Sequence, residues 1–186
     1  MSQITQLNHF AGNIYLPNTT NQSSVEGAKA TAFILKYEPE YLQYILGYEL
    51  YDLFEDGLLA NTTIYKNIRD GVVYTDVWTG RTEKWYGFAT VGTNPIANYI
   101  YYQLLKNNAQ QTTGIGQVNT VAENATRVSP EIPMCSAWNE MVDFNIKLYG
   151  FLYANQDIYP SWIGNDYYAR SQEFVNLFRK INTFGI

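Results

Sequence analysis

Apolar residues recur every three or four positions along much of the chain, a spacing typical of helices that bury one face. The clearest case lies between Tyr41 and Phe54, and Gly47 interrupts it, so we expect a local break or a close helix contact there. Ser and Asn at capping positions and Pro at first helical positions set the boundaries. The predicted helices cover residues 23 or 24 to about 36, 39 to about 55, 94 to about 108, 133 to about 155 and 166 to about 180.

The hydrophobic period changes to two over residues 72–88, where Val73, Thr75 and Val77 alternate with other residues. A Thr-Gly pair then supplies a turn, so this stretch predicts a β-hairpin. A lone two-stranded hairpin is only marginally stable in water, so it must pack on the helices or pair with another chain. Its aromatic content favours pairing with another chain. The aromatic residues expected at such a contact are Tyr74, Trp78, Trp85 and Tyr86.

These elements predict a mainly α fold, a bundle of four to five helices with one β-hairpin insertion and extended N- and C-terminal segments. Residues 1–23 are rich in Asn, Gln and Thr and are interpreted as a polar arm. Residues 24–180 form the helical domain with the hairpin at 72–88, and residues 110–130 are expected to be irregular. Residues 181–186 form an apolar tail that is too short to fold by itself.

Composition points to a surface that is covered by protein partners. Only 16% of the 186 residues are charged, against roughly 25% in ordinary globular proteins, and 17 residues are Tyr. Tyr is enriched at protein interfaces, although a Tyr-rich core is the alternative. The net charge of −5 and the scattered Lys and Arg residues argue against sequence-specific nucleic-acid binding. An acidic lining of a channel that DNA passes through stays compatible with this charge.

The candidate chemical residues are few. The single His, His9, lies in the polar arm, and the single Cys, Cys135, lies on the apolar side of a predicted helix, where a thiol is usually inert. Thr113 to Gly116 lacks the Lys of a phosphate loop. We therefore expect no enzyme, no cofactor and no metal site. A solvated acidic face is the favoured interpretation of Asp52, Glu55 and Asp56, with a hydrolase using Asp52 and Glu55 as an alternative.

The sequence also bears on whether the chain is directed to a membrane or to secretion. No apolar run approaches the roughly 20 residues that a membrane span needs. The first ten residues lack the charged and apolar regions of a secretory signal. We therefore expect no membrane association. A carbohydrate-binding module that stacks sugars on Trp78, Trp85 and Trp162 is a further alternative.

Several segments between residues 25 and 155 resemble known proteins. Leu46, Gly47, Leu50 and Tyr51 match the Leu-Gly-X-X-Leu-Tyr pattern of early helices in phage head–tail connector proteins. The segments 84–88, 94–102 and 111–116 are similar to segments that follow these helices in the same family. Residues 122–125 and 137–141 are similar to structural proteins of crAss-like phages.

The resemblance implies a virion protein, made in the host bacterial cytoplasm and placed at the portal vertex and tail junction. It implies a ring of about twelve copies that docks to the portal protein, extends the DNA channel without binding DNA specifically, and forms a platform for tail or further ring proteins. Another tail-ring or capsid-decorating role is the alternative. The residues expected to dock into the portal are Phe174, Leu177, Phe178, Ile181, Phe184 and Ile186. For residues 174–178, completion of the domain's own core is an equal possibility.

Overall fold

The computed structural model describes residues 3–18, 23–77, 79–109, 111–113, 116–118, 130–164 and 178–182. Within these ranges it is mainly helical with a two-stranded antiparallel hairpin, which confirms the predicted fold class. The α-helices are α1 (Val25–Leu46), α2 (Tyr48–Leu59), α3 (Thr63–Asp70), α4 (Pro95–Ala109) and α5 (Glu131–Ala154). The strands are β1 (Val72–Thr75), β2 (Thr82–Trp85), β3 (Gln111–Thr113) and β4 (Gly116–Val118).

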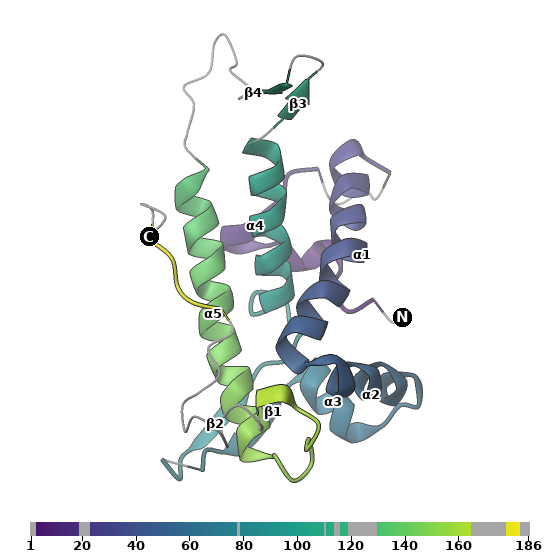
Figure 1. The fold of residues 1–186 in the computed structure, drawn as a ribbon, viewed down its shortest axis with the longest axis vertical. Coiled ribbons are helices and arrows are strands. Elements are labelled where there is room, and N and C mark those ends of the chain that lie inside the picture. Colours follow the sequence, from purple (N-terminus) through teal and green to yellow (C-terminus); the bar gives the residue numbers. More distant parts are fainter. Residues whose placement is uncertain are drawn as a thin grey trace.

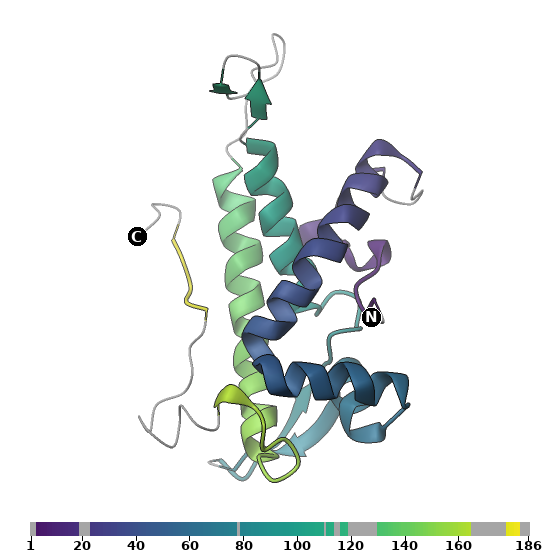
Figure 2. The same ribbon diagram turned by 45° about the vertical axis from the view of Figure 1, so that its right-hand side comes forward.

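Helices α4 and α5 lie side by side along the long axis, and α1 packs against α4 (Figures 1 and 2). The main core lies between these three helices, where Ile45, Ile100, Met141 and Leu148 have no exposed surface. Helices α2 and α3 sit at one end of the body. The β1–β2 hairpin lies at that same end beside α5, and the β3–β4 hairpin lies beyond the opposite end of α4 (Figure 1).

Two predicted capping residues form the expected hydrogen bonds at the N-termini of their helices. The Ser24 hydroxyl accepts a hydrogen bond from the Gly27 N–H at 2.9 Å. Asn94 Oδ1 accepts the N–H groups of Ile96 at 2.9 Å and Ala97 at 3.1 Å. Each side chain therefore satisfies N–H groups that a helix start leaves without an intrahelical partner.

The predicted boundary at Pro39 is wrong, because α1 continues through Pro39 to Leu46. Proline lacks the N–H that would reach the Leu35 carbonyl four residues earlier. Leu35 is exposed, so solvent can satisfy that carbonyl and the helix continues. The break occurs at Gly47 instead, as the sequence predicts. There a φ of 80° separates α1 from α2, a conformation that favours glycine.

Helix α3 and the β3–β4 pair were not predicted. Helix α3 is eight residues long and mostly polar, with one fully buried side chain, Ile68, so its amphipathic pattern spans too few turns to be recognised. The strands β3 and β4 are three residues each and lie in the stretch that was expected to be irregular.

The N-terminal segment packs on the domain in place of the polar arm that the sequence predicts. It forms two short 3-10 turns, Leu7–His9 and Gly12–Ile14. Ile4, Phe10 and Ile14 are each at most 6% exposed. The carboxylate of Glu38, in the middle of α1, accepts the N–H groups of Ile4 at 2.9 Å and Thr5 at 2.7 Å. This segment is thus part of the core and is tied to α1 by its backbone.

The predicted helix over residues 166–180 is not supported at its C-terminal end. Residues 165–177 lie outside the described residues, and residues 178–182 are extended. No helix among the described residues is long and apolar enough to span a membrane.

Candidate functional site

The extended C-terminal segment, residues 178–182, lies along α5 (Figure 1). Asn139 makes two hydrogen bonds with the backbone of Ile181: its Nδ2 donates to the Ile181 carbonyl and its Oδ1 accepts the Ile181 N–H, each at 2.8 Å. This pairing satisfies both backbone groups of one residue, as a neighbouring β-strand would. The side chain of Asn139 therefore recognises an extended backbone and not a particular sequence.

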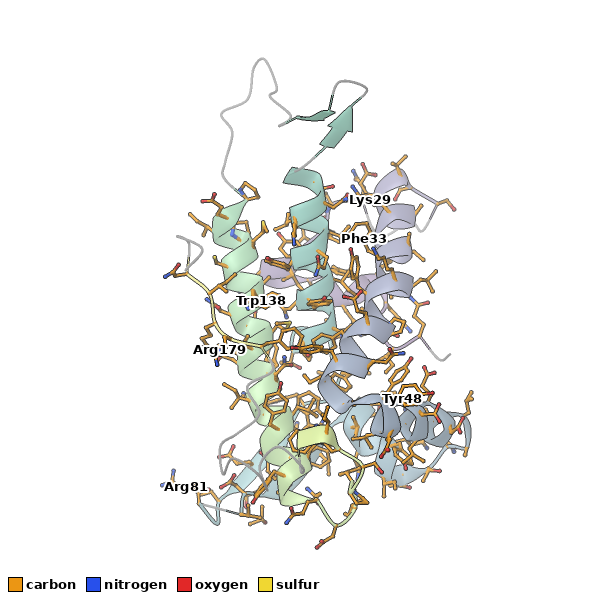
Figure 3. The ribbon with its side chains drawn as sticks, in the orientation of Figure 1. Lys29, Phe33, Tyr48, Arg81, Trp138 and Arg179 are labelled. Carbon is orange, nitrogen blue, oxygen red and sulfur yellow. The ribbon has the colours of Figure 1, made fainter. Side chains whose placement is uncertain are left out.

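Three further side chains of α5 flank Asn139 and complete the contact. Trp138 Nε1 donates to the Arg179 carbonyl at 2.7 Å, and the two residues lie close together in Figure 3. The Cys135 thiol donates to the Asn182 carbonyl at 3.2 Å. Asp143 forms an ion pair with Lys180 at 2.7 Å. From Lys180 to Asn182 the contacted helix residue moves back from Asp143 through Asn139 to Cys135, so the segment runs antiparallel to α5. We call this row, Cys135, Trp138, Asn139 and Asp143, the α5 ladder.

An aromatic socket receives the first residue of the segment. The Phe178 ring stacks on Tyr41 with centroids 5.7 Å apart and an interplanar angle of 15°. It also contacts Tyr44 at 4.8 Å and Trp138 at 5.5 Å, with Tyr99 at 6.1 Å. These four rings come from α1, α4 and α5. Phe178 therefore completes the domain's own aromatic cluster, the second of the two possibilities considered for residues 174–178.

Two of the six predicted portal-docking residues are described, and both contact their own chain. Phe178 fills the aromatic socket, and the backbone of Ile181 is held by Asn139. The remaining four lie outside the described residues. They are Phe174, Leu177, Phe184 and Ile186.

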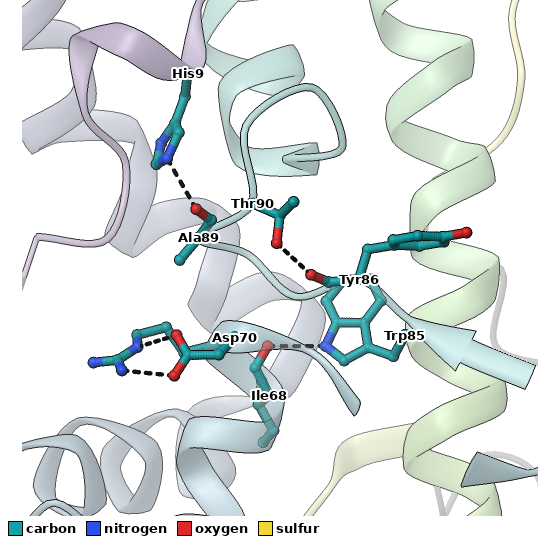
Figure 4. Close-up of polar contacts among 8 residues, drawn as sticks. His9, Ile68, Asp70, Trp85, Tyr86, Ala89 and Thr90 are labelled. Atoms are coloured by element: carbon teal, nitrogen blue, oxygen red, sulfur yellow. Dashed lines mark hydrogen bonds and ion pairs between the residues drawn. The ribbon is translucent and has the colours of Figure 1, made fainter. Parts of the chain in front are cut away.

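Trp85, which was expected at a contact between chains, is buried inside its own domain. Trp85 is 1% exposed, and its Nε1 donates to the Ile68 carbonyl at 2.9 Å (Figure 4). Its ring meets Phe88 edge to face with centroids 5.3 Å apart. The hairpin therefore anchors itself to its own helices through this ring, and the ring has no surface to offer a neighbour.

The other predicted hairpin residues differ in their surroundings. Tyr74 is half-buried and packs against Phe151 of α5, and this burial raises its pKa to about 12. Tyr86 is half-buried, and the ammonium groups of Lys84 and Lys147 each lie 5.1 Å from its ring centroid. Trp78 lies outside the described residues.

The hairpin exposes aliphatic side chains that the sequence interpretation overlooked. Val73 is 59% and Val77 55% exposed, and Thr75 between them is exposed as well. The alternation of these three residues was the signal that could have identified this face. We call Val73, Thr75 and Val77 the hairpin patch. Among the described residues, β1 and β2 pair only with each other, so no further strand pairs with their outer edges.

A second surface with exposed apolar side chains lies where α1 meets α2. Tyr48 is 74% and Ile163 49% exposed, and the Ile163 side chain lies against Gly47. Tyr48 and Ile163 line a hollow of about 260 Å³ whose other lining residues are Gly47, Glu49, Pro160, Ser161 and Trp162. We call Tyr48 and Ile163 the junction patch. Tyr48 and Arg81, which adjoins the hairpin turn, stand on opposite sides of the body in Figure 3.

The chemical candidates from the sequence do not gather into one site. Asp52 and Asp56 are exposed on α2, and Glu55 is half-buried beside them. Cys135 is half-buried, whereas a buried thiol was expected. Over the described ranges, no group of three or more His, Cys, Asp or Glu residues is placed to hold a metal ion. Gly114 and Ile115, in the glycine-containing loop, are outside the described residues.

His9 is a structural residue of the packed N-terminal segment. Its Nδ1 accepts the Gln6 N–H at 3.0 Å and faces Asn94 Nδ2 at 3.1 Å, while its Nε2 lies 3.1 Å from the Ala89 carbonyl (Figure 4). These partners select the neutral tautomer with its proton on Nε2. Burial lowers the pKa of His9 below its ordinary value of 6.5, and the bond to Ala89 opposes this only in part.

Stability is expected to fall as the pH drops below about 6.5, because the unfolded chain then binds a proton at His9 that the folded chain resists. Above pH 6.5 both states are neutral at His9 and its contribution is fully present. Replacing His9 by Asn should flatten the slope between pH 7 and 5 in urea titrations. Glu38 and Glu140 have raised pKa values and give slopes of the opposite sign, so the difference between the two proteins isolates His9. Equal slopes would contradict this assignment.

Burial weakens the carbohydrate-binding alternative. Trp85 is 1% and Trp162 2% exposed, so neither ring face is open for a sugar to stack on. Comparison with known proteins finds no protein family, curated protein or solved structure that matches the chain. What the surface offers a partner is therefore inferred from its own residues and contacts.

Proposed function

We propose that this chain is a structural subunit of a closed ring, a head–tail connector that docks to the portal of a phage particle. In this role the ring extends the DNA channel and forms a platform for tail proteins. The resemblance of residues 25–155 to connector proteins supports this proposal. So does a low content of charged residues, 16%, in a chain rich in Tyr.

The observation that carries the proposal is the presence of two separate groups of exposed apolar side chains, the hairpin patch and the junction patch. A cyclic ring needs a heterologous contact, in which one patch of each copy meets a different patch of its neighbour. The hairpin patch and the junction patch differ in shape and origin. The first is the exposed face of a two-stranded hairpin, and the second surrounds a hollow of about 260 Å³. A contact between these two unlike surfaces would be heterologous, as a closed ring requires.

The proposal predicts a small and fixed number of copies in purified particles. Quantitative mass spectrometry against the major capsid protein should find about twelve copies of this chain, the number that one ring of the implied symmetry holds. Hundreds of copies would favour the capsid-decorating alternative. Absence from particles would overturn the connector role.

A further inference from the structure

The α5 ladder has the properties of a docking site for an extended peptide. Its four side chains follow one another at helical spacing, so they form a continuous stripe on one side of α5. Three of them bond backbone groups of the segment, and the fourth, Asp143, pairs with Lys180. Next to the stripe, the aromatic socket accepts the Phe178 ring. The site therefore combines backbone recognition with one aromatic anchor and one charge pair.

The docked segment lies at the surface and is reachable from outside. Arg179, Lys180 and Asn182 are exposed, while Phe178 and Ile181 are half-buried. None of the contacts to the α5 ladder depends on which copy of the chain supplies the segment. An identical segment from a neighbouring copy would make the same bonds, and this equivalence makes segment exchange a low-cost route to association.

The length of chain between the body and the segment permits such an exchange. Gly164 and Phe178 are separated by fourteen peptide steps, which span at most roughly 45–50 Å when fully extended. A compact chain of this size has a radius of gyration of roughly 16 Å. The tether is therefore long enough to reach the same site on an adjoining copy.

We propose that the α5 ladder and the aromatic socket receive residues 178–182 of a neighbouring copy when the chain assembles. Each copy then donates one segment and accepts one. Every α5 ladder stays occupied, and the contacts that were made within one chain are now made between two copies. This inference rests on the proposed ring only in requiring a neighbouring copy. In the isolated monomer the segment occupies the site on its own chain.

The contact between Cys135 and Asn182 provides a direct test, because Cys135 is the only cysteine of the chain. One chain keeps its natural Cys135, and a second, differently tagged chain carries Cys135→Ala with Asn182→Cys. The two are co-expressed and treated with a short bismaleimide, which links two thiols without oxidation. A covalent heterodimer containing the 135–182 junction peptide is the expected result, because neither chain holds both thiols.

Matched variants separate docking from chance collision. Asn139→Ala removes the backbone pairing and should reduce the mixed junction several-fold, whereas Gln156→Ala, an exposed amide just beyond α5, should leave it unchanged. A third chain, which carries both the natural Cys135 and Asn182→Cys, reports linking within one copy. If this chain is linked within itself while the mixed junction is absent at every concentration, the exchange is overturned. A ring counted in particles without the mixed junction would also overturn the exchange while keeping the connector role. Finding the mixed junction in a chain that is absent from particles would support the exchange and overturn the connector role.

Discussion

Replacing Trp85 by alanine is expected to lower the free energy of unfolding of the monomer by about 3–5 kcal/mol. The ring is 1% exposed and meets Phe88 edge to face, so its removal leaves a cavity beneath the hairpin. The Ile68 carbonyl also loses the N–H that Trp85 donates at 2.9 Å. Urea unfolding followed by circular dichroism measures the loss.

Two variants identify the source of this loss. Trp85→Phe keeps most of the ring but removes the N–H, so it should cost roughly 1–3 kcal/mol. Val73→Ala changes an exposed residue of the same hairpin and should stay within about 0.5 kcal/mol. A Trp85→Ala monomer that is as stable as the wild type but fails to self-associate would contradict the structural role. It would restore Trp85 as a contact between copies.

The hairpin shows what a local sequence pattern can predict and what it cannot. Alternation over residues 72–88 was enough to predict two paired strands, and the observed register joins Val72 to Trp85 and Thr75 to Thr82. Alternation does not say which face turns inward, because that depends on what lies beneath. Here the inner partner includes Ile68 of α3, a helix too short and polar to be predicted. The aromatic face was therefore assigned to the outside when it is Val73 and Val77 that are exposed.

The N-terminal segment was misjudged for a related reason. Its composition is polar, and its three core residues are separated by spacings that match neither a helix nor a strand. The bonds that hold it join Ile4 and Thr5 to Glu38, more than thirty residues away. A pattern read over neighbouring residues contains no information about such a partner.

The candidate site at the C-terminus was anticipated only in part. The sequence predicted a helix over about 166–180 followed by an apolar tail, yet residues 178–182 are extended. Side chains of α5 satisfy their backbone groups in place of a helix. That these residues dock into the portal stays a prediction. The structure adds a binding site for them on the same chain, the α5 ladder, which the composition did not reveal.

Replacing Glu38 by glutamine is expected to lower the free energy of unfolding by roughly 2–3 kcal/mol and to loosen the N-terminal segment. Glu38 is 4% exposed, and its two oxygens accept the N–H groups of Ile4 and Thr5. Glutamine has nearly the same shape but only one side-chain oxygen. Its amide group then faces one of the two N–H donors, and at this depth water does not replace the lost acceptor.

Amide hydrogen exchange gives this prediction a local readout. Exchange at Ile4 and Thr5 should accelerate in Glu38→Gln, because opening of residues 3–18 becomes easier than opening of the α4–α5 pair. Asp52→Asn makes the same chemical change at an exposed position of α2, so it should alter neither stability by more than about 0.5 kcal/mol nor exchange at Ile4. Unchanged exchange at both amides in Glu38→Gln would mean that burial of Phe10 and Ile14 holds the segment without the carboxylate. The segment would then be fixed by its side chains and not by its backbone.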